Sequence, residues 1–174
     1  MTNWPFNFMI KQHGFTIVEL VTVIILIGIL AVAVLPKFDG TASYEAHTHR
    51  AQLISALRLT QQRAMQQTNN NDGYCHQIIF DNDANVSRYG VPDRTDCTVT
   101  SFPNDWQPDA TGFEVDSKYE VSFQINGVAN PSVVVFDSMG RPQGNCFGGC
   151  IINVTSSVET LTIKIESEGY VHAI

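Results

Sequence analysis

One carboxylate stands inside a long apolar run, and its position raises the question of what chemistry it serves. The run extends from Phe15 to Leu35, 21 residues, and Glu19 is its one charged residue. A charge at the centre of a bilayer costs about 2.5–3.5 kcal/mol on insertion scales and less near the end of a span. Two interpretations are open. In the first, the Glu19 side chain reaches the lipid headgroups or is protonated, and it has no function. In the second, the carboxylate pairs with a cation inside an assembly.

A cut between Gly14 and Phe15 would supply such a cation. Each subunit would then begin with a positive amine at the membrane surface, within reach of the Glu19 carboxylate of a neighbouring chain. Phe15 to Glu19 would also form the first turn of a helix, where the helix dipole favours an anion. The spacing therefore favours an electrostatic pair between subunits.

The apolar run is long enough to form a transmembrane helix. At 1.5 Å per residue it rises roughly 30 Å, the thickness of the hydrocarbon core. A cleaved secretory signal has a shorter apolar core, about 7–15 residues, followed by a cleavage site. Lys11 and His13 precede the run, so the positive-inside rule keeps the N-terminus cytoplasmic. The sequence predicts a single-pass anchor with an exported C-terminal body.

The order Gly14-Phe15-Thr16-x-x-Glu19, after a short leader that contains Lys11, resembles the class III signal of type IV prepilins and type II secretion pseudopilins. The resemblance implies that prepilin peptidase cleaves after Gly14 and N-methylates Phe15. It implies that Glu19, together with Thr16, acts in assembly by pairing with a neighbouring N-terminus. The implied partners are other pilin subunits, the bacterial inner membrane and its pilus assembly platform.

The segment "LIGILAVAVLPKFDGTASYEA" resembles subunits of the mannose-sensitive haemagglutinin (MSHA) pilus, which implies a role in cell adhesion. Gly28 and Pro36 match the positions between which assembled pilins lose helical order. Proline lacks an N–H group and glycine is a weak helix former, so a helix break there is physically reasonable. A simple kink at the membrane boundary is the alternative.

The C-terminal third, "VVVFDSMGRPQGN" to "ETLTIKIESEGYV", resembles the minor-pilin domain shared by the secretion pseudopilin H and the fimbrial T proteins. Phe136, Gly140 and Gly169 carry that match. The middle of the chain, residues 75–130, resembles no family.

The remaining periodicities predict an α+β fold, with a long N-terminal helix packed on antiparallel sheets. After Pro36 an apolar stripe at helical spacing consists of Ala46, Leu53, Ile54, Leu57, Ala64 and Met65. The helix is expected to run from Phe15 to about Gln67, where a polar cluster ends it. A coiled coil is the alternative for its second half, but the stripe is too short for several heptads. The predicted strands are "CHQIIF", "VSRYGV", "CTVTSF", "YEVSFQI", "SVVVF", "CIINVT", "ETLTIKIE" and "GYVHAI".

This pattern divides the chain into four segments. Residues 1–14 form a leader peptide, and residues 15–35 the transmembrane helix. Residues 36–73 contain the periplasmic half of the long helix and its C-terminal loop, and residues 74–174 a β-rich pilin globular domain.

Four cysteines, Cys75, Cys97, Cys146 and Cys150, all follow the apolar run. An even number in an exported domain indicates disulfides, for which three pairings are possible. A zinc site is the alternative, but only Cys146 and Cys150 have close spacing. Cys75 and Cys97 open two neighbouring predicted strands, and Cys146 and Cys150 bracket a glycine loop. The favoured pairs are therefore 75–97 and 146–150.

Two groups of residues have some features of metal sites. Asp81-x-Asp83-x-Asn85 opens like a calcium loop, but no glycine or glutamate stands at the sixth and twelfth positions, so a polar hairpin turn is favoured. His47 and His49 are two residues apart on a helix and do not share a face. The sequence predicts no metal and no cofactor.

The bulk composition excludes further classes. A formal charge of −7 without any basic run argues against nucleic acid as a partner. No nucleophile elbow, phosphate loop or zinc motif is present, so no catalytic residue and no enzymatic activity are predicted. Trp106, in a proline-containing loop, either projects for adhesion or packs against the sheet to anchor the loop.

The sequence thus predicts a minor pilin, a structural subunit that acts in initiation or tip assembly of a type IV pilus of the MSHA type. A type II secretion pseudopilin has the same kind of N-terminal signal and apolar helix, and it is the nearest alternative. A ligand-binding subunit at a pilus tip and an anchored periplasmic enzyme are alternatives from other classes.

Overall fold

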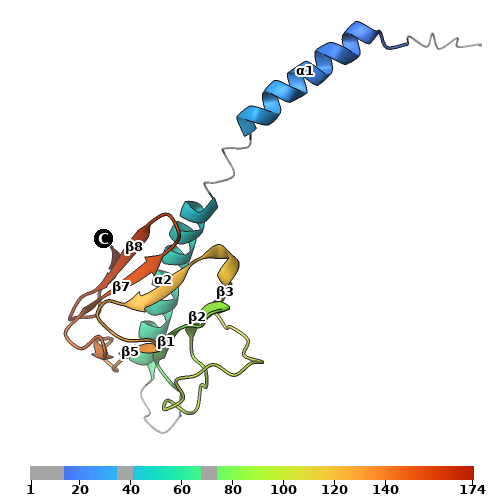
Figure 1. Ribbon diagram of the computed structural model, residues 1–174. Helices are drawn as coiled ribbons and strands as arrows, with labels where there is room; N and C mark the ends of the chain where they lie inside the picture. Colours follow the sequence, from blue (N-terminus) through green and yellow to red (C-terminus); the bar gives the residue numbers. More distant parts are fainter. Residues whose placement is uncertain (1–13, 35–40, 68–73) are drawn as a thin grey trace, which may run out of the picture. The chain divides into compact units, whose positions relative to one another are not determined.

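Two helices and two antiparallel sheets make up the part of the chain that the structure, a computed structural model, describes: residues 14–34, 41–67 and 74–174 (Figure 1). Helix α1 (Ile17–Val34) belongs to one compact unit, Met1–Asp39. Helix α2 (Thr41–Gln66) and both sheets belong to a second unit, Gly40–Ile174. The predicted α+β class is confirmed.

The sequence predicts one long N-terminal helix, whereas the structure describes two helices. α1 begins at Ile17 rather than Phe15, and Gly28 lies inside it in helical conformation. Pro36, the other predicted break, lies outside the described residues, as does the rest of the connection to α2.

The predicted membrane span is not confirmed. α1 contains 18 residues, which rise about 27 Å, whereas the hydrocarbon core is about 30 Å thick. Within the described residues, no helix combines the length and the hydropathy that a bilayer crossing requires. Leu35, the last residue of the predicted span, is not among them.

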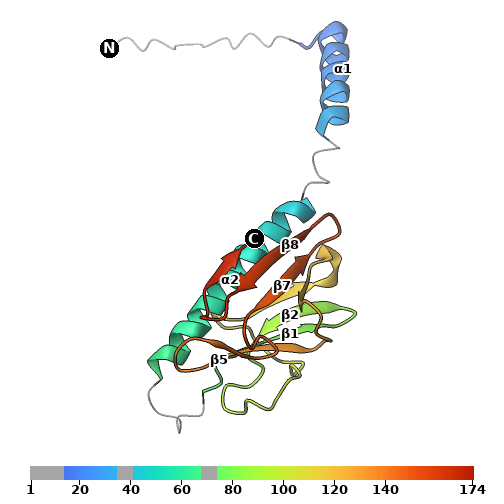
Figure 2. The same cartoon turned by 90° about the vertical axis from the view of Figure 1, so that its left-hand side faces the viewer.

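Helix α2 packs one face against strands of both sheets (Figure 2). Its buried face consists of Ala46, His49, Leu53, Ala56, Leu57, Thr60 and Ala64. Met65, which the sequence places on this face, is 46% exposed. The reason is the helical period, since a residue directly after the buried Ala64 points about 100° away from it.

The two sheets are antiparallel throughout. Sheet A has the order β3-β2-β1-β5-β6 and contains β1 (Gln77–Asn82), β2 (Val86–Gly90), β3 (Phe113–Asp116), β5 (Ser132–Phe136) and β6 (Pro142–Gly144). Sheet B has the order β4-β7-β8-β9 and contains β4 (Ser122–Ile125), β7 (Cys150–Thr155), β8 (Thr160–Ile165) and β9 (Val171–Ala173).

The core lies where the inward faces of the sheets meet α2. In β7 and β8 the apolar positions alternate, and Ile152 pairs with Ile163 with both side chains fully buried. Tyr89 of sheet A packs edge-to-face on Phe123 of sheet B, with ring centroids 4.9 Å apart. Aromatic contacts of this kind stabilise a core beyond their area of burial.

One asparagine joins the two sheets at the end of β1. The Asn82 side-chain nitrogen donates to the Phe123 carbonyl oxygen at 2.7 Å, and the Phe123 N–H donates to the Asn82 side-chain oxygen at 3.0 Å. The amide thus takes the place of a neighbouring strand for the edge strand β4. No local sequence pattern indicates this contact.

One strand prediction is wrong, one is too long, and two strands are not predicted. Residues 97–102, "CTVTSF", form turns rather than a strand, and β3 and β6 are not predicted from the sequence. β4 begins at Ser122, after a 3₁₀ turn at Ser117–Tyr119. In residues 97–102 a side-chain hydrogen bond takes the place of strand pairing: the carboxylate of Asp96 accepts the backbone N–H of Thr98 at 2.9 Å. Such local bonds compete with strand pairing.

Candidate assembly site

The start of α1 is fixed by a side-chain cap. The Thr16 hydroxyl oxygen accepts the backbone N–H of Glu19 at 3.2 Å, and the Thr16 carbonyl accepts the N–H of Leu20 at 3.2 Å. Thr16 is therefore the N-cap residue, and Glu19 is the third residue of the helix. Threonine followed three residues later by glutamate is the spacing of a capping box. The cap holds the Glu19 backbone in the first turn, where the helix dipole stabilises a negative charge.

Helix α1 exposes apolar side chains on every side. All residues from 14 to 31 are exposed, and Phe15 and Ile17 are each 83% exposed. A helix that is apolar all round normally lies in a protein interior or in lipid. Exposed apolar surface of this extent marks an interaction site, because water solvates it poorly. The described surface of α1 therefore requires a partner.

The structure places Gly14, Phe15, Thr16 and Glu19 together at the start of α1 and Gly28 farther along that helix. Gly14 and Phe15 directly precede the Thr16 cap, outside the helix, where the backbone is accessible to a peptidase. Nothing lies within 4 Å of a side chain that would be added at Gly28. Gly28 lies nine residues beyond Glu19 in the same helix and is therefore separate from the capped first turn.

All four cysteines belong to the second unit and form disulfides. Cys75 bonds to Cys97, with Cα atoms 5.3 Å apart, and Cys146 bonds to Cys150, with Cα atoms 4.9 Å apart. This is the pairing that the sequence favours. Closing the 22-residue separation between Cys75 and Cys97 stabilises the fold by about 3 kcal/mol in the chain-entropy model.

The other candidate ligand groups have different partners. Asp81 lies 3.6 Å from Arg88 in an ion pair across β1 and β2, next to the turn that joins these strands. His49 is buried against Phe113, whereas His47 is exposed and 3.5 Å from Glu159. Among the described residues, no three histidine, cysteine or acidic side chains are grouped as a metal site requires.

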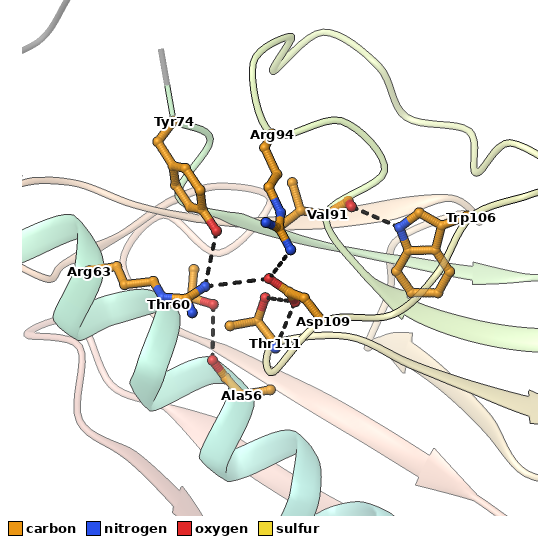
Figure 3. A network of polar contacts seen from close by, with 9 residues as sticks. All are labelled: Ala56, Thr60, Arg63, Tyr74, Val91, Arg94, Trp106, Asp109 and Thr111. Atoms are coloured by element: carbon orange, nitrogen blue, oxygen red, sulfur yellow. Dashed lines mark hydrogen bonds and ion pairs between the residues drawn. The ribbon is translucent and has the colours of Figure 1, made fainter. Parts of the chain in front are cut away.

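The long loop of residues 91–112 is held to α2 by Asp109 (Figure 3). One carboxylate oxygen accepts the N–H and the hydroxyl of Thr111 at 2.8 and 2.7 Å. The other lies 2.9 Å from Arg94 and 3.6 Å from Arg63 of α2. Arg63 also donates to the Tyr74 hydroxyl at 3.0 Å. This network fixes the loop by charge at a place where it has no regular structure.

Trp106 anchors the same loop. Its indole N–H donates to the Val91 carbonyl at 3.0 Å (Figure 3). Its ring packs edge-to-face on Phe102 with centroids 4.5 Å apart. A side chain added at Gly90 or Gly112 would meet the Trp106 ring at 2.8 and 2.9 Å. Of the two interpretations of Trp106 from the sequence, the structure agrees with the one in which the side chain packs inward and anchors the loop.

We expect Asp109→Asn to lower the free energy of unfolding by about 1–3 kcal/mol, because Arg63 and Arg94 lose their carboxylate. Burial acts to raise the Asp109 pKa, but hydrogen bonds from Thr111 and the charges of both arginines lower it overall. A lowered pKa stabilises the fold above the unfolded pKa, about 3.9, and this stabilisation is lost as the pH falls through the folded pKa. Urea unfolding of the wild type and the variant should therefore differ at pH 7, and the difference should shrink below about pH 4 and vanish once the pH is below the folded pKa.

A wild type and a variant that differ by the same amount at pH 7 and at pH 3 would contradict this role of the Asp109 charge. Asp105→Asn, in the same loop but exposed, is the matched control and should leave the unfolding free energy nearly unchanged.

Gln61 is a structural residue that the sequence does not indicate. Its side-chain nitrogen donates to the carbonyl oxygens of Gly140 and Gly169, each at 2.7 Å. These are the two glycines that carry the C-terminal resemblance, and α2 thus holds both of their turns. Arg58, one helical turn earlier, donates to the Val171 carbonyl at 2.7 Å. Polar residues off an apolar stripe look like solvent-facing residues, so no sequence signal separates these two from their neighbours.

Comparison with known proteins gives one match, to the N-terminal region. Residues 9–35 match the family described as the prokaryotic N-terminal methylation motif. No curated protein and no solved structure matches the chain. The matched residues include Gly14, Phe15 and Glu19, which are the residues at the capped start of α1. The chain therefore carries a class III signal of the type IV pilin kind.

Proposed function

We propose that this chain is a minor pilin, a structural subunit without catalytic activity that acts in the initiation or tip assembly of a type IV pilus and contributes to adhesion. The observation that carries the proposal is the capped first turn with Glu19, which opens a helix whose apolar side chains are exposed on every side. The methylation motif over the same residues supports it.

In the proposed mechanism, prepilin peptidase cleaves between Gly14 and Phe15 and N-methylates Phe15. The chain is held in the inner membrane by residues 15–35, with the sheets on the periplasmic side. On assembly, α1 packs against the equivalent helices of other subunits. In the membrane these side chains are already removed from water, so van der Waals packing between the helices, rather than the hydrophobic effect, stabilises this step. Glu19 neutralises the amine of a neighbouring chain.

The finer assignment is to the MSHA pilus, where this chain is most like minor pilin C. It rests on the sequence resemblance around Gly28 and Pro36. The C-terminal resemblance to pseudopilin H and the fimbrial T proteins rests on Phe136, Gly140 and Gly169, and the turns of these two glycines meet at Gln61.

A type II secretion pseudopilin is the second candidate, because the N-terminal methylation motif is common to both. The two assignments predict different deletion phenotypes. Loss of the gene should abolish pili in the first case and protein export in the second.

The proposal is tested by intact mass and N-terminal sequencing of the protein isolated from its native membranes. We expect a chain that begins at Phe15, carries one methyl group on its amine and lacks the four hydrogens of two disulfides. A Gly14→Val variant should stay at full length. A wild-type protein that retains its first fourteen residues would overturn the proposal.

A further inference from the structure

We propose that Thr22 is a second hydrogen-bond acceptor for the neighbouring N-terminal amine that Glu19 neutralises, an inference that rests on the proposed function. Glu19 and Thr22 are the two polar side chains of α1, whose other residues are apolar or glycine. They are three residues apart, so they lie on one face of the helix, about 5–6 Å between their Cβ atoms. One polar stripe therefore crosses an otherwise apolar surface.

The hydrogen bond that Thr22 already makes determines what it can still do. Its hydroxyl donates to the Glu19 carbonyl oxygen at 2.9 Å. A hydroxyl group has one donor and two acceptor lone pairs, so its donor is used and its oxygen remains an acceptor. In surroundings without water, the Thr22 hydroxyl can therefore form a further hydrogen bond only as an acceptor, and a cationic amine supplies N–H donors.

The amine needs more than one acceptor. An N-methylated terminal amine keeps two N–H bonds, and an unmethylated one has three. Seen from the amine nitrogen, the two oxygens of one carboxylate are separated by roughly half the angle between two N–H bonds. Both N–H bonds therefore cannot align with the Glu19 carboxylate at once. An N–H group left unpaired in an apolar interface is costly. An oxygen beside the carboxylate, on the same helix face, meets that need.

Thr16 is less suited to this role, because it has one acceptor lone pair fewer to offer than Thr22. Its hydroxyl oxygen already accepts the Glu19 N–H as the helix cap, at 3.2 Å. Thr22 is exposed, and its bond to the Glu19 carbonyl fixes the hydroxyl toward that residue. The geometry thus separates two threonines of the same face: Thr16 positions the Glu19 backbone, and Thr22 contacts the incoming amine.

The test replaces Thr22 in the full-length chain, expressed in place of the wild type. The readout is the ratio of the variant in sheared filaments to the variant in the membrane fraction. Thr22→Val keeps the β-branched shape and removes the oxygen, and it should lower this ratio at least about tenfold, the effect of losing a hydrogen bond to a charged group. Thr22→Ser keeps the oxygen and should restore the ratio to within about twofold of wild type. Thr100→Val, the same exchange at an exposed threonine of the second unit, should leave it unchanged.

The outcomes separate this inference from the proposed function, with Glu19→Ala as the reference. If Thr22→Val assembles like the wild type while Glu19→Ala is excluded, the Thr22 contact is overturned and the pairing of Glu19 stands. If serine fails as valine does, the hydroxyl oxygen alone does not sustain assembly, and the acceptor role is again overturned. If Glu19→Ala itself assembles normally, the proposed assembly mechanism fails.

Discussion

Glu19→Ala is expected to leave the protein in the membrane fraction and to remove it from filaments. In an assembled interface the substitution would leave the amine of the neighbouring chain without its counter-ion. Removing one partner of a buried ion pair costs about 3–5 kcal/mol, which corresponds to more than a hundredfold loss of incorporation. Alanine has the highest helix propensity, and the backbone N–H of residue 19 still reaches the Thr16 cap. The loss would therefore not arise from a damaged helix.

The comparison of filament and membrane fractions checks this expectation, with two further variants as controls. Glu19→Gln keeps the shape and hydrogen-bonding capacity without the charge, and it should fail almost as completely as alanine. Glu19→Asp keeps the charge on a shorter side chain and should retain part of the incorporation. Filaments that contain Glu19→Ala at the wild-type level would exclude charge pairing as the basis of assembly.

The features that the sequence reveals are those whose cause is local. The cap at the start of α1 depends on Thr16 and Glu19, three residues apart, and both the motif and the helix dipole point to it. Alternating strands such as β8 are found because each inward position needs an apolar side chain. Four apolar residues of the buried α2 face are found for the same reason, whereas Met65 is exposed and the buried His49, Ala56 and Thr60 are not predicted.

The features that the sequence does not reveal depend on residues far apart in the chain. Gln61 reaches turns 79 and 108 residues away, and Asn82 reaches a strand 41 residues away. Both are ordinary polar side chains in their local sequence. Residues 97–102 show the converse: their composition suits a strand, but the Asp96 side chain takes the backbone N–H of Thr98 and the disulfide at Cys97 fixes the loop.

Gly169→Ala is expected to lower the free energy of unfolding by about 3–5 kcal/mol, a large part of the stability of a domain this size. Gly169 has φ of +93°, a conformation that costs a side-chain-bearing residue about 1–2 kcal/mol. An added Cβ would also overlap the Gly140 carbonyl oxygen and the Gln61 side-chain nitrogen. The two turns would have to separate, and both hydrogen bonds of Gln61 would be weakened, each worth about 1 kcal/mol.

Gly127→Ala provides the matched control for this prediction. Gly127 also has a positive φ, +76°, but nothing lies within 4 Å of an added Cβ. Its substitution should therefore cost only the backbone term, about 1–2 kcal/mol. Urea unfolding of the full-length chain in mild detergent, followed by near-ultraviolet circular dichroism, measures both variants. Equal losses for the two would mean that the close approach of the Gly140 and Gly169 turns contributes nothing, and that Gln61 does not hold the end of the sheet to α2.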